Sequence, residues 1–360
     1  MWWRSKESLA IPGDDWLNGA AARIRGGARE LCCRIGCHPQ GFKHSASDLK
    51  RLAGLSVSPE RLRQIVEGEG QRAQAAQASG AMPANGQGAA CIVEPSGPSR
   101  VYVGVDGVMV PTVTTAEKQL RASRRRRRRK PKRYRCRPGH RERYKEFKLA
   151  GFYNQDKTRR HVMATGGNPD ALGRVLRRDG RRFGIAEADE VVGVVDGAPW
   201  IRTQLKKFRG CSHIGLDDYH FSEHVAAAAK TVFGEGTPQA ATWRKHVLDL
   251  ALNTGVEEVL DEVTQQARQT RSPAKRDALR RLRNYIGQRT AMIRYPYCRQ
   301  KGWDIGSGPT EALCKTMTAR LKGSGMRWDP AGAQAMLNLV ALNDSNEWEE
   351  YWRLQGVHTN

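Results

Sequence analysis

The chain has 360 residues, of which 39% are hydrophobic, so it is long enough for one large domain or two to three ordinary ones. Its 61 Lys and Arg residues outnumber its 37 Asp and Glu residues, and the formal net charge is +24. This balance favours a polyanionic partner, with nucleic acid ahead of an anionic membrane surface. The longest apolar runs, such as VVGVV at 191–195, are too short for a spanning helix, which excludes an integral membrane protein.

The first residues reach two Asp before any apolar run of signal-peptide length, so we expect no export and a cytoplasmic location. Eight scattered cysteines without a C-x-x-C pair fit a reducing compartment. The cluster Cys32, Cys33, Cys37 and His38 could hold zinc, but no second ligand pair follows at zinc-finger spacing. We therefore expect buried or unused thiols there.

A helix-turn-helix-like segment is predicted at about 45–70, within an N-terminal region of residues 1–70. Gly54 breaks the first helical pattern, and a Ser-Pro pair starts the second. On the second helix, Arg61 and Arg63 could enter a DNA groove. A plain helical hairpin with solvated arginines explains the pattern equally well.

Residues 71–98 are rich in Ala, Gln, Gly and Pro, and we predict a linker. Strand-like and helical runs then follow one another, at 101–110, about 145–153, near 169–182 and at 190–201. This succession indicates an α/β core whose first part covers 99–223.

From 224 to 300 the pattern is helical throughout, with apolar residues three and four positions apart. We interpret this stretch as an all-helical insertion in the α/β domain, because another helix with clear terminal signals follows it. The core would then resume at 301–345, and a C-terminal tail would occupy 346–360.

The segment at 121–145 is strongly basic and contains a single acid, Glu142. Its like charges repel one another unless a polyanion or water surrounds them, so the segment cannot be core. We predict a basic loop at 121–143 with salt-sensitive, sequence-independent affinity for DNA. The alternative is a merely solvated loop. The residues expected to contact DNA are Arg124, Arg125, Arg126, Arg127, Arg128, Arg129 and Lys130.

Asp106 is the first of three separated acids. In VYVGVDGVMVP, Val101, Val103 and Val105 share one face of a predicted strand, which leaves Asp106 on the other face. An Asp-Gly pair between two valine-rich runs is also the strongest signal for a two-residue hairpin. On this local pattern alone, the hairpin is favoured.

Asp196 ends the run VVGVVD, whose valines predict a central strand that is covered on both faces. Open α/β sheets bind ligands at the carboxyl ends of such strands. A turn role for Asp196 and the following glycine is equally consistent with the pattern.

Glu311 lies in WDIGSGPTEALCKTMTARLKGSGMRW, near the start of a predicted helix. Pro309 suits the first helical position, which makes Gly308 the cap and Glu311 the third residue. An acid there stabilises the helix dipole without any metal. Two faces follow from the helical period, a buried one with Leu313, Met317 and Leu321 and another with Glu311, Lys315, Thr318 and Lys322. The second face could hold a metal at its acidic end and phosphates along its lysines.

Three separated acids on two strands and a helix suit phosphodiester chemistry. Two Mg²⁺ ions in such a site need bridging and terminal carboxylates. Because each acid is ambiguous alone, the hypothesis depends on the joint presence of Asp106, Asp196 and Glu311 in a chain of net charge +24.

The motifs resemble those of DDE transposases of bacterial insertion sequences, most closely the ISKra group. The matching segments follow the family order over about 100–345, and they are VYVGVDGVMVP, KEFKLAGFY, VVGVVDGAPWI, LDDYHFSEHV and GWDIGSGPTEALCKTMTARLKGSGMRW. The last segment is highly specific. The resemblance implies an RNase H-like core, a mixed sheet flanked by helices, that an all-helical insertion interrupts before the final catalytic helix.

By position, Asp106, Asp196 and Glu311 match the catalytic and metal-binding acids of the family, which would hold two Mg²⁺ (or Mn²⁺) ions. The supporting residues that the resemblance implies are Asp217 and His220, in a D-x-x-H motif, and Trp328, in a closing GM-x-W motif. The implied partners are the terminal inverted repeats of the element, target DNA and further copies of the chain in a synaptic complex at the bacterial nucleoid.

Two alternatives stay open. Family members usually have a longer N-terminal region than the thirty unpatterned residues at the start of this sequence, so the chain could be an inactive or truncated copy that only binds DNA. HFSEH at 220–224 matches the H-x-x-E-H pattern of some zinc proteases, in which two His hold zinc. The charge of +24 has no role in a protease, which makes this the remote alternative.

Overall fold

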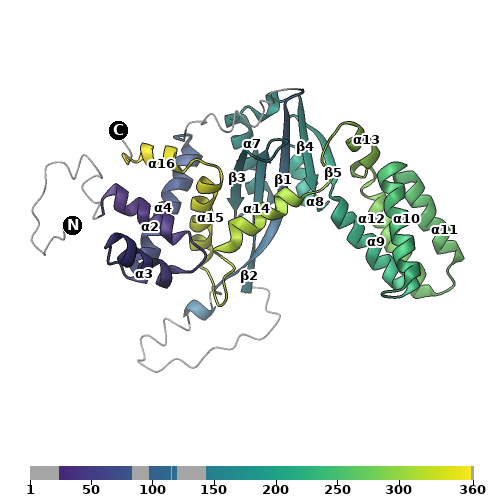
Figure 1. Cartoon of the computed structure of the whole chain (residues 1–360), viewed down its shortest axis with the longest axis horizontal. Coiled ribbons are helices and arrows are strands. Elements are labelled where there is room, and N and C mark those ends of the chain that lie inside the picture. The colour runs from purple at the N-terminus through teal and green to yellow at the C-terminus, as the bar shows by residue number, and fades with distance from the viewer. Residues whose placement is uncertain (1–23, 83–96, 115, 120–142, 358–360) are drawn as a thin grey trace, which may run out of the picture. The chain divides into compact units, whose positions relative to one another are not determined.

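The computed structural model describes residues 24–82, 97–114, 116–119 and 143–357 (Figure 1). The chain forms two compact units. The first comprises Met1–Asn85, Val108–Phe147 and Thr316–Asn360, and the second comprises Gly86–Gly107 and Lys148–Lys315. The predicted basic loop, with Arg124 to Lys130, lies outside the described residues.

The strands form a five-stranded mixed sheet in the order β3-β2-β1-β4-β5. Its strands are β1 (Arg100–Pro111), β2 (Tyr144–Tyr153), β3 (Arg160–Thr165), β4 (Glu190–Val195) and β5 (Cys211–Leu216). β1 pairs with β4 and β4 with β5 in parallel, whereas β2 and β3 are antiparallel. With its flanking helices the sheet confirms the predicted α/β class.

In the second unit, the alternation along β1 separates two faces of the sheet. Val101, Val103 and Val105 are buried in one hydrophobic cluster, together with residues of α7 (Pro169–Arg182) and α8 (Pro199–Lys206). Tyr102 belongs to a different cluster, with Val192 and Val194 of β4. The valine pattern therefore predicted both faces of this strand.

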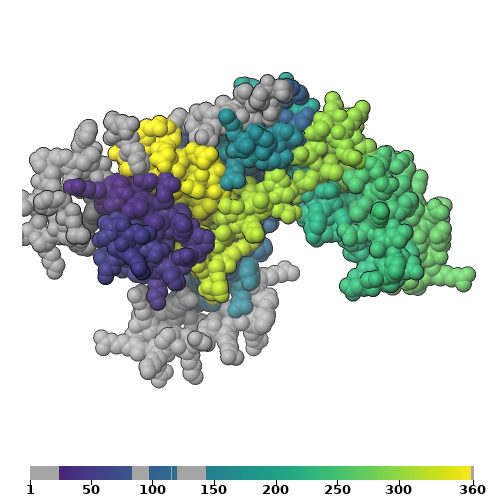
Figure 2. Space-filling model, viewed as in Figure 1, coloured from purple at the N-terminus to yellow at the C-terminus, as the bar shows by residue number. Residues whose placement is uncertain are grey.

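The helices between β5 and α14 (Gly308–Ala319) follow one another without a strand. They are α9 (Asp218–Phe233), α10 (Pro238–Asn253), α11 (Val256–Gln269), α12 (Pro273–Gly287), the short 3₁₀ helix at Thr290–Met292 and α13 (Tyr295–Gln300). Their apolar faces join the same cluster as the valine face of the sheet, and Figure 2 shows the side chains of this stretch, in green, closely packed. The helical stretch begins at Asp218, six residues before the predicted start.

The first unit contains α2 (Gly26–Gly36), α3 (Phe42–Ala53), α4 (Pro59–Ser79), α15 (Pro330–Asp344) and α16 (Trp348–Leu354). α3 and α4 form the predicted helical pair. Gly54 ends α3 in the left-handed region (φ 68°), and the Ser58 hydroxyl caps α4 by accepting the Arg61 N–H at 3.1 Å. Leu52, predicted on the apolar face of α3, is instead 77% exposed.

Three segments of this unit differ from the sequence predictions. α2 forms where no pattern was found, and α4 continues to Ser79, so that the start of the predicted linker is helical. Its Ala, Gln and Arg residues are good helix formers, and Gly70 packs so closely on Ala335 of α15 that a Cβ would lie 2.0 Å from the Ala335 carbonyl oxygen. The predicted tail contains α16, in which Trp352 is fully buried.

Among the helices of the described residues, none combines the length and apolar character needed to cross a bilayer.

His213 on β5 makes the stability of the fold sensitive to acid. It is 8% exposed, its ring lies tilted against that of Trp303 at 5.3 Å between centroids, and its Nε2 lies 3.3 Å from Cys298 Sγ. Burial, assisted by the positive charge of Arg294, lowers the pKa of His213 to about 4. Because the unfolded chain then binds the proton more tightly, the free energy of unfolding should fall as the pH drops from 6.5 towards 4.

For the wild type we expect His213 to account for a loss of about 2 kcal/mol between pH 7 and pH 5. Urea unfolding at the two pH values measures it. His213→Gln, which cannot titrate, should lose correspondingly less, whereas the exposed His38→Gln should behave like the wild type. Equal acid losses in all three proteins would show that His213 does not titrate as inferred.

Candidate metal-binding carboxylate site

Three aspartates lie in a row across neighbouring parallel strands of the second unit. Val103 of β1 pairs with Gly193 of β4, and the same register continued by three residues puts Asp106 opposite Asp196. On the other side of β4, Val195 pairs with Leu216 of β5, so Asp196 and Asp217 are the next residues of the two strands. Adjacent strands are about 4.8 Å apart, so the three aspartates lie side by side across the sheet, at the level where β4 and β5 end.

The predicted hairpin at Asp106 is wrong. β1 continues without interruption from Arg100 to Pro111, and Asp106 Oδ1 accepts the N–H of Gly107 at 2.6 Å. A hairpin would have ended β1 at Asp106, whereas Val108 and Val110 beyond it are buried in the continuing strand, and this burial decides the conformation in place of the local Asp-Gly signal.

Asp196 follows β4 directly and also takes part in a turn. Its Oδ1 accepts the Ala198 N–H at 2.8 Å, and Gly197 has a φ of 82°, which favours glycine. The two interpretations of this residue are therefore compatible, because the turn that leads into α8 holds the carboxylate at the strand end.

Glu311 is brought to the sheet by close packing of α14. The helix starts at Gly308, one residue earlier than predicted, because the Ser307 carbonyl accepts the N–H groups of Thr310 (2.8 Å) and Glu311 (3.1 Å). A Cβ on Gly104 of β1 would lie 2.0 Å from Thr310 Oγ1. The glycine thus lets the start of α14 lie directly on the strand that carries Asp106.

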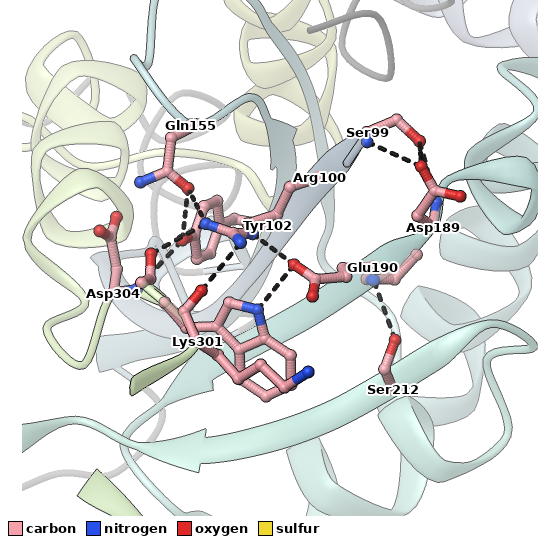
Figure 3. Close-up of polar contacts among 12 residues, drawn as sticks. Ser99, Arg100, Tyr102, Gln155, Asp189, Glu190, Ser212, Lys301 and Asp304 are labelled. Carbon is pink, nitrogen blue, oxygen red and sulfur yellow. Dashed lines mark hydrogen bonds and ion pairs between the residues drawn. The ribbon is translucent and has the colours of Figure 1, made fainter. Parts of the chain in front are cut away.

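A polar network fixes the segment that leads into α14 (Figure 3). Arg100 at the start of β1 donates from Nε to Glu190 of β4 (2.6 Å) and from its other nitrogens to the carbonyls of Lys301 (3.0 Å) and Gly302 (2.8 Å). The Tyr102 hydroxyl accepts the Asp304 N–H at 3.0 Å. These bonds tie the end of the helical stretch back to the strands, a few residues before Glu311.

Asp217 is buried and accepts hydrogen bonds both from α9 and from the residue that precedes α14. It is 1% exposed, accepts the backbone N–H and Nδ1 of His220 at 2.8 and 3.0 Å, and also accepts the Ser307 N–H. Burial acts to raise its pKa, but these hydrogen bonds outweigh it and the pKa of Asp217 is lowered. Burial likewise acts to lower the pKa of His220, yet the bond to Asp217 and the nearby charges of Asp196 and Glu223 raise it.

Asp217, His220 and Glu311 could hold one metal ion, because one ligand atom from each lies within 4.8 Å of the other two. The charges of Asp196 and His220 also act on Asp106. Burial raises its pKa and the negative charge of Asp196 raises it further, while hydrogen bonds from Gly107 and the Cys314 thiol act in the opposite direction. Of the three sequence-predicted acids, Glu311 alone belongs to this group among the described residues, whereas Asp106 and Asp196 lie outside it and are close enough for the charge of Asp196 to act on Asp106.

The lysine face predicted on α14 is only partly present. Lys315 is exposed, but Thr318 is 2% exposed, and the helix ends at Ala319, before Lys322. Because the helical period stops at Ala319, the face that depended on it does not extend to Lys322. Lys322 is exposed in the first unit, and its contact with DNA stays a prediction.

Trp328 lies in the first unit, where it is 6% exposed and its indole N–H donates to the Leu321 carbonyl at 3.2 Å. The guanidinium of the buried Arg320 stacks on Trp328 and on Phe42, 5.1 and 4.4 Å from the ring centroids, and donates to the Gly36 carbonyl at 3.0 Å. Within this unit the closing motif thus serves packing, and its supporting role in catalysis stays a prediction.

The two arginines of α4 differ in their pairing. Arg63 forms ion pairs with Glu60 at 2.6 Å and Glu67 at 2.5 Å, whereas Arg61 is exposed beside Gln64. Of the two side chains, Arg61 is therefore the one whose guanidinium is more available to bind a phosphate of DNA.

The HFSEH segment does not bring its two histidines to one centre. His220 bonds Asp217, whereas the His224 ring stacks on Tyr285 at 3.6 Å between centroids. Burial and the charge of Arg289 lower the pKa of His224.

Burial raises the pKa values of Cys32 and Cys37 to about 11 and about 12, and neither belongs to a metal-binding group among the residues described.

Several residues at the site were not found from the sequence. The Arg100 network, Cys314 and Tyr285 carry no motif, because their roles depend on which strands and helices meet. Cys314 could have been found as the residue one helical turn after Glu311.

The fold and the site define an α/β protein with a candidate metal site at the carboxyl edge of its parallel strands. The chain belongs to the Uncharacterised protein family (UPF0236), whose profile matches residues 151–352, more than half of the sequence. The match includes Asp196, Asp217, His220 and Glu311, while Asp106 precedes it. Among curated proteins, none matches the chain.

Proposed function

We propose that this protein is a DDE transposase that cleaves DNA at the ends of an insertion sequence and transfers the strands to target DNA. One observation carries the proposal, the row of Asp106, Asp196 and Asp217 across three parallel strands with Glu311 on the helix packed beside them. The mixed sheet, its flanking helices and the helical stretch before α14 agree with the RNase H-like core and helical insertion of the ISKra group.

The donor set fits divalent cations. Carboxylate oxygens are the ligands that Mg²⁺ and Mn²⁺ prefer. Burial raises the pKa of Asp106, and so does the negative charge of Asp196, which a cation would relieve. Asp106, Asp196 and Glu311 would hold two ions, with Asp217 and His220 beside them. When bound, such ions supply Lewis-acid activation of the attacking oxygen and stabilise the charge on the leaving oxygen.

The proposed reaction has two displacements at phosphorus. Water attacks the phosphodiester at the element end, and the bond to the 3′ oxygen breaks, which releases a 3′-hydroxyl. That hydroxyl then attacks a target phosphodiester and displaces its 3′ oxygen, so no covalent bond to the protein forms. Two ends must be held together, which favours a dimer or larger assembly, at the nucleoid of the bacterial cytoplasm.

An inactive relative that only binds DNA would share the charge of +24 and every basic residue, so activity alone separates the two proposals. The zinc protease is not favoured, because the two histidines of HFSEH have different neighbours.

The test is cleavage of labelled duplexes that carry the DNA flanking the gene, with scrambled duplexes as the control. We expect the purified chain to nick the flanking duplex in Mg²⁺ or Mn²⁺ and to be inactive in EDTA. Binding to both duplexes without cleavage in either metal would favour the inactive DNA-binding protein instead.

A further inference from the structure

The helical stretch returns to the sheet through a stack of three side chains. The rings of His224 on α9 and Tyr285 on α12 lie 3.6 Å apart, and the Arg289 guanidinium lies 4.1 Å from the Tyr285 ring centroid. Arg202 on α8 donates to the carbonyl of Gln288 at 2.8 Å, next to Arg289. The end of α12 is therefore held against the sheet domain at this point.

Arg289 lies against the residue that follows Asp196. A Cβ on Gly197 would be 2.7 Å from Arg289 Nε and 3.1 Å from its Cδ. The side chain thus crosses the backbone of the turn that holds the Asp196 carboxylate.

Among the described residues, Arg289 forms no ion pair with a carboxylate. Its buried Nε has no hydrogen-bond partner there, and Nη1 donates to the Tyr285 carbonyl at 3.2 Å. The surrounding field is acidic. Burial raises the pKa of Tyr285 to about 12, and the charges of Asp196, Asp217 and Glu223 act on it beside that of Arg289. Arg289 as a whole is only partly buried although its Nε is buried, so a ligand would approach it at its terminal nitrogens.

A phosphodiester that approaches this site meets several carboxylates that repel it. Metal ions compensate the acids and coordinate some of the phosphate oxygens. A guanidinium next to Asp196 can bind the remaining oxygens, because its planar donors match phosphate geometry. Arg289 has no other anionic partner among the described residues that would occupy those donors.

We propose that Arg289 binds a phosphate oxygen of the DNA strand held at the carboxylate site. The helical stretch would then contribute a substrate-binding residue to the sheet domain. This assignment rests on the proposed function. The structural alternative is that Arg289 only fills the space above Gly197 and stabilises the C-terminal end of α12.

The test compares Arg289→Gln and Arg289→Lys with a control on the preceding helix α12, Arg283→Gln, whose side chain is exposed. Single-turnover cleavage of the flanking duplex at saturating DNA is measured in the full chain. Arg289→Gln should cleave about 100-fold more slowly, since it removes an electrostatic contact in the transition state. Arg289→Lys should recover part of the rate, and Arg283→Gln should stay within about twofold of the wild type.

A second readout does not depend on cleavage. Loss of a positive charge beside the acids should tighten Mn²⁺ binding several-fold in Arg289→Gln, as measured by electron paramagnetic resonance, whereas unchanged Mn²⁺ binding would show that the guanidinium is too far from the carboxylates to act at their site. If Arg289→Gln cleaves at the wild-type rate while Asp196→Asn is inactive, the assignment of Arg289 is wrong and the transposase proposal stands. If the wild type does not cleave at all, the transposase proposal fails first.

Discussion

Glu311→Gln is expected to abolish divalent-ion-dependent strand cleavage, with a rate loss of at least about 10³-fold. Glutamine keeps the size of the side chain but lacks the charge that a hard cation requires. Asp106→Asn and Asp196→Asn should have the same effect, because the three acids would share the same ions. Single-turnover cleavage of the flanking duplex in Mg²⁺ and in Mn²⁺ measures the loss.

The same variants should still fold and bind DNA. Burial and the charge of Asp196 raise the pKa of Asp106, so a neutral side chain suits the folded protein better than the carboxylate does. In EDTA, Asp106→Asn should therefore unfold at or above the wild-type temperature. Asp261→Asn, an exposed acid on α11, is the matched control. Full activity in any of the three variants would refute the proposed triad.

The faces of β1 and the class of the fold could be predicted from the sequence, because they depend on local alternation. Val101, Val103 and Val105 alternate with Tyr102 and occupy different clusters, as the period of two requires. The pairing of the strands could not be predicted. Asp106 and Asp196 become neighbours only through the register of β1 with β4, which no local pattern encodes.

Where local signals failed, packing between distant segments decided the structure. The Asp-Gly pair after Val105 predicts a hairpin in isolation, but β1 continues through it as a central strand between β2 and β4. Arg289 was missed for a related reason. The amphipathic period of α12 predicts which residues are buried, and it does not predict that the end of the helix lies beside Asp196.

The distance between Asp106 and Glu311 depends on a residue with no side chain. Gly104 precedes Asp106 by two positions on the same face of β1, and Thr310 precedes Glu311 by one. A Cβ at Gly104 would lie 2.0 Å from Thr310 Oγ1 and 3.0 Å from Thr310 Cβ, so Gly104→Ala must push α14 away or distort the strand. We expect a loss of about 1–3 kcal/mol in the free energy of unfolding, measured in urea.

Cleavage should suffer more than stability does, because a displacement of about 1 Å at a catalytic group can reduce the rate about 100-fold. Thr310→Ala removes the clashing hydroxyl, so Gly104→Ala with Thr310→Ala should recover most of both losses. Gly68→Ala on α4, where a Cβ meets no atom within 4 Å, is the control and should leave cleavage unchanged. If Gly104→Ala alone retains wild-type cleavage, the close contact of α14 with β1 does not position Glu311. If the double variant stays as slow as the single one, the clash with Thr310 is not the cause.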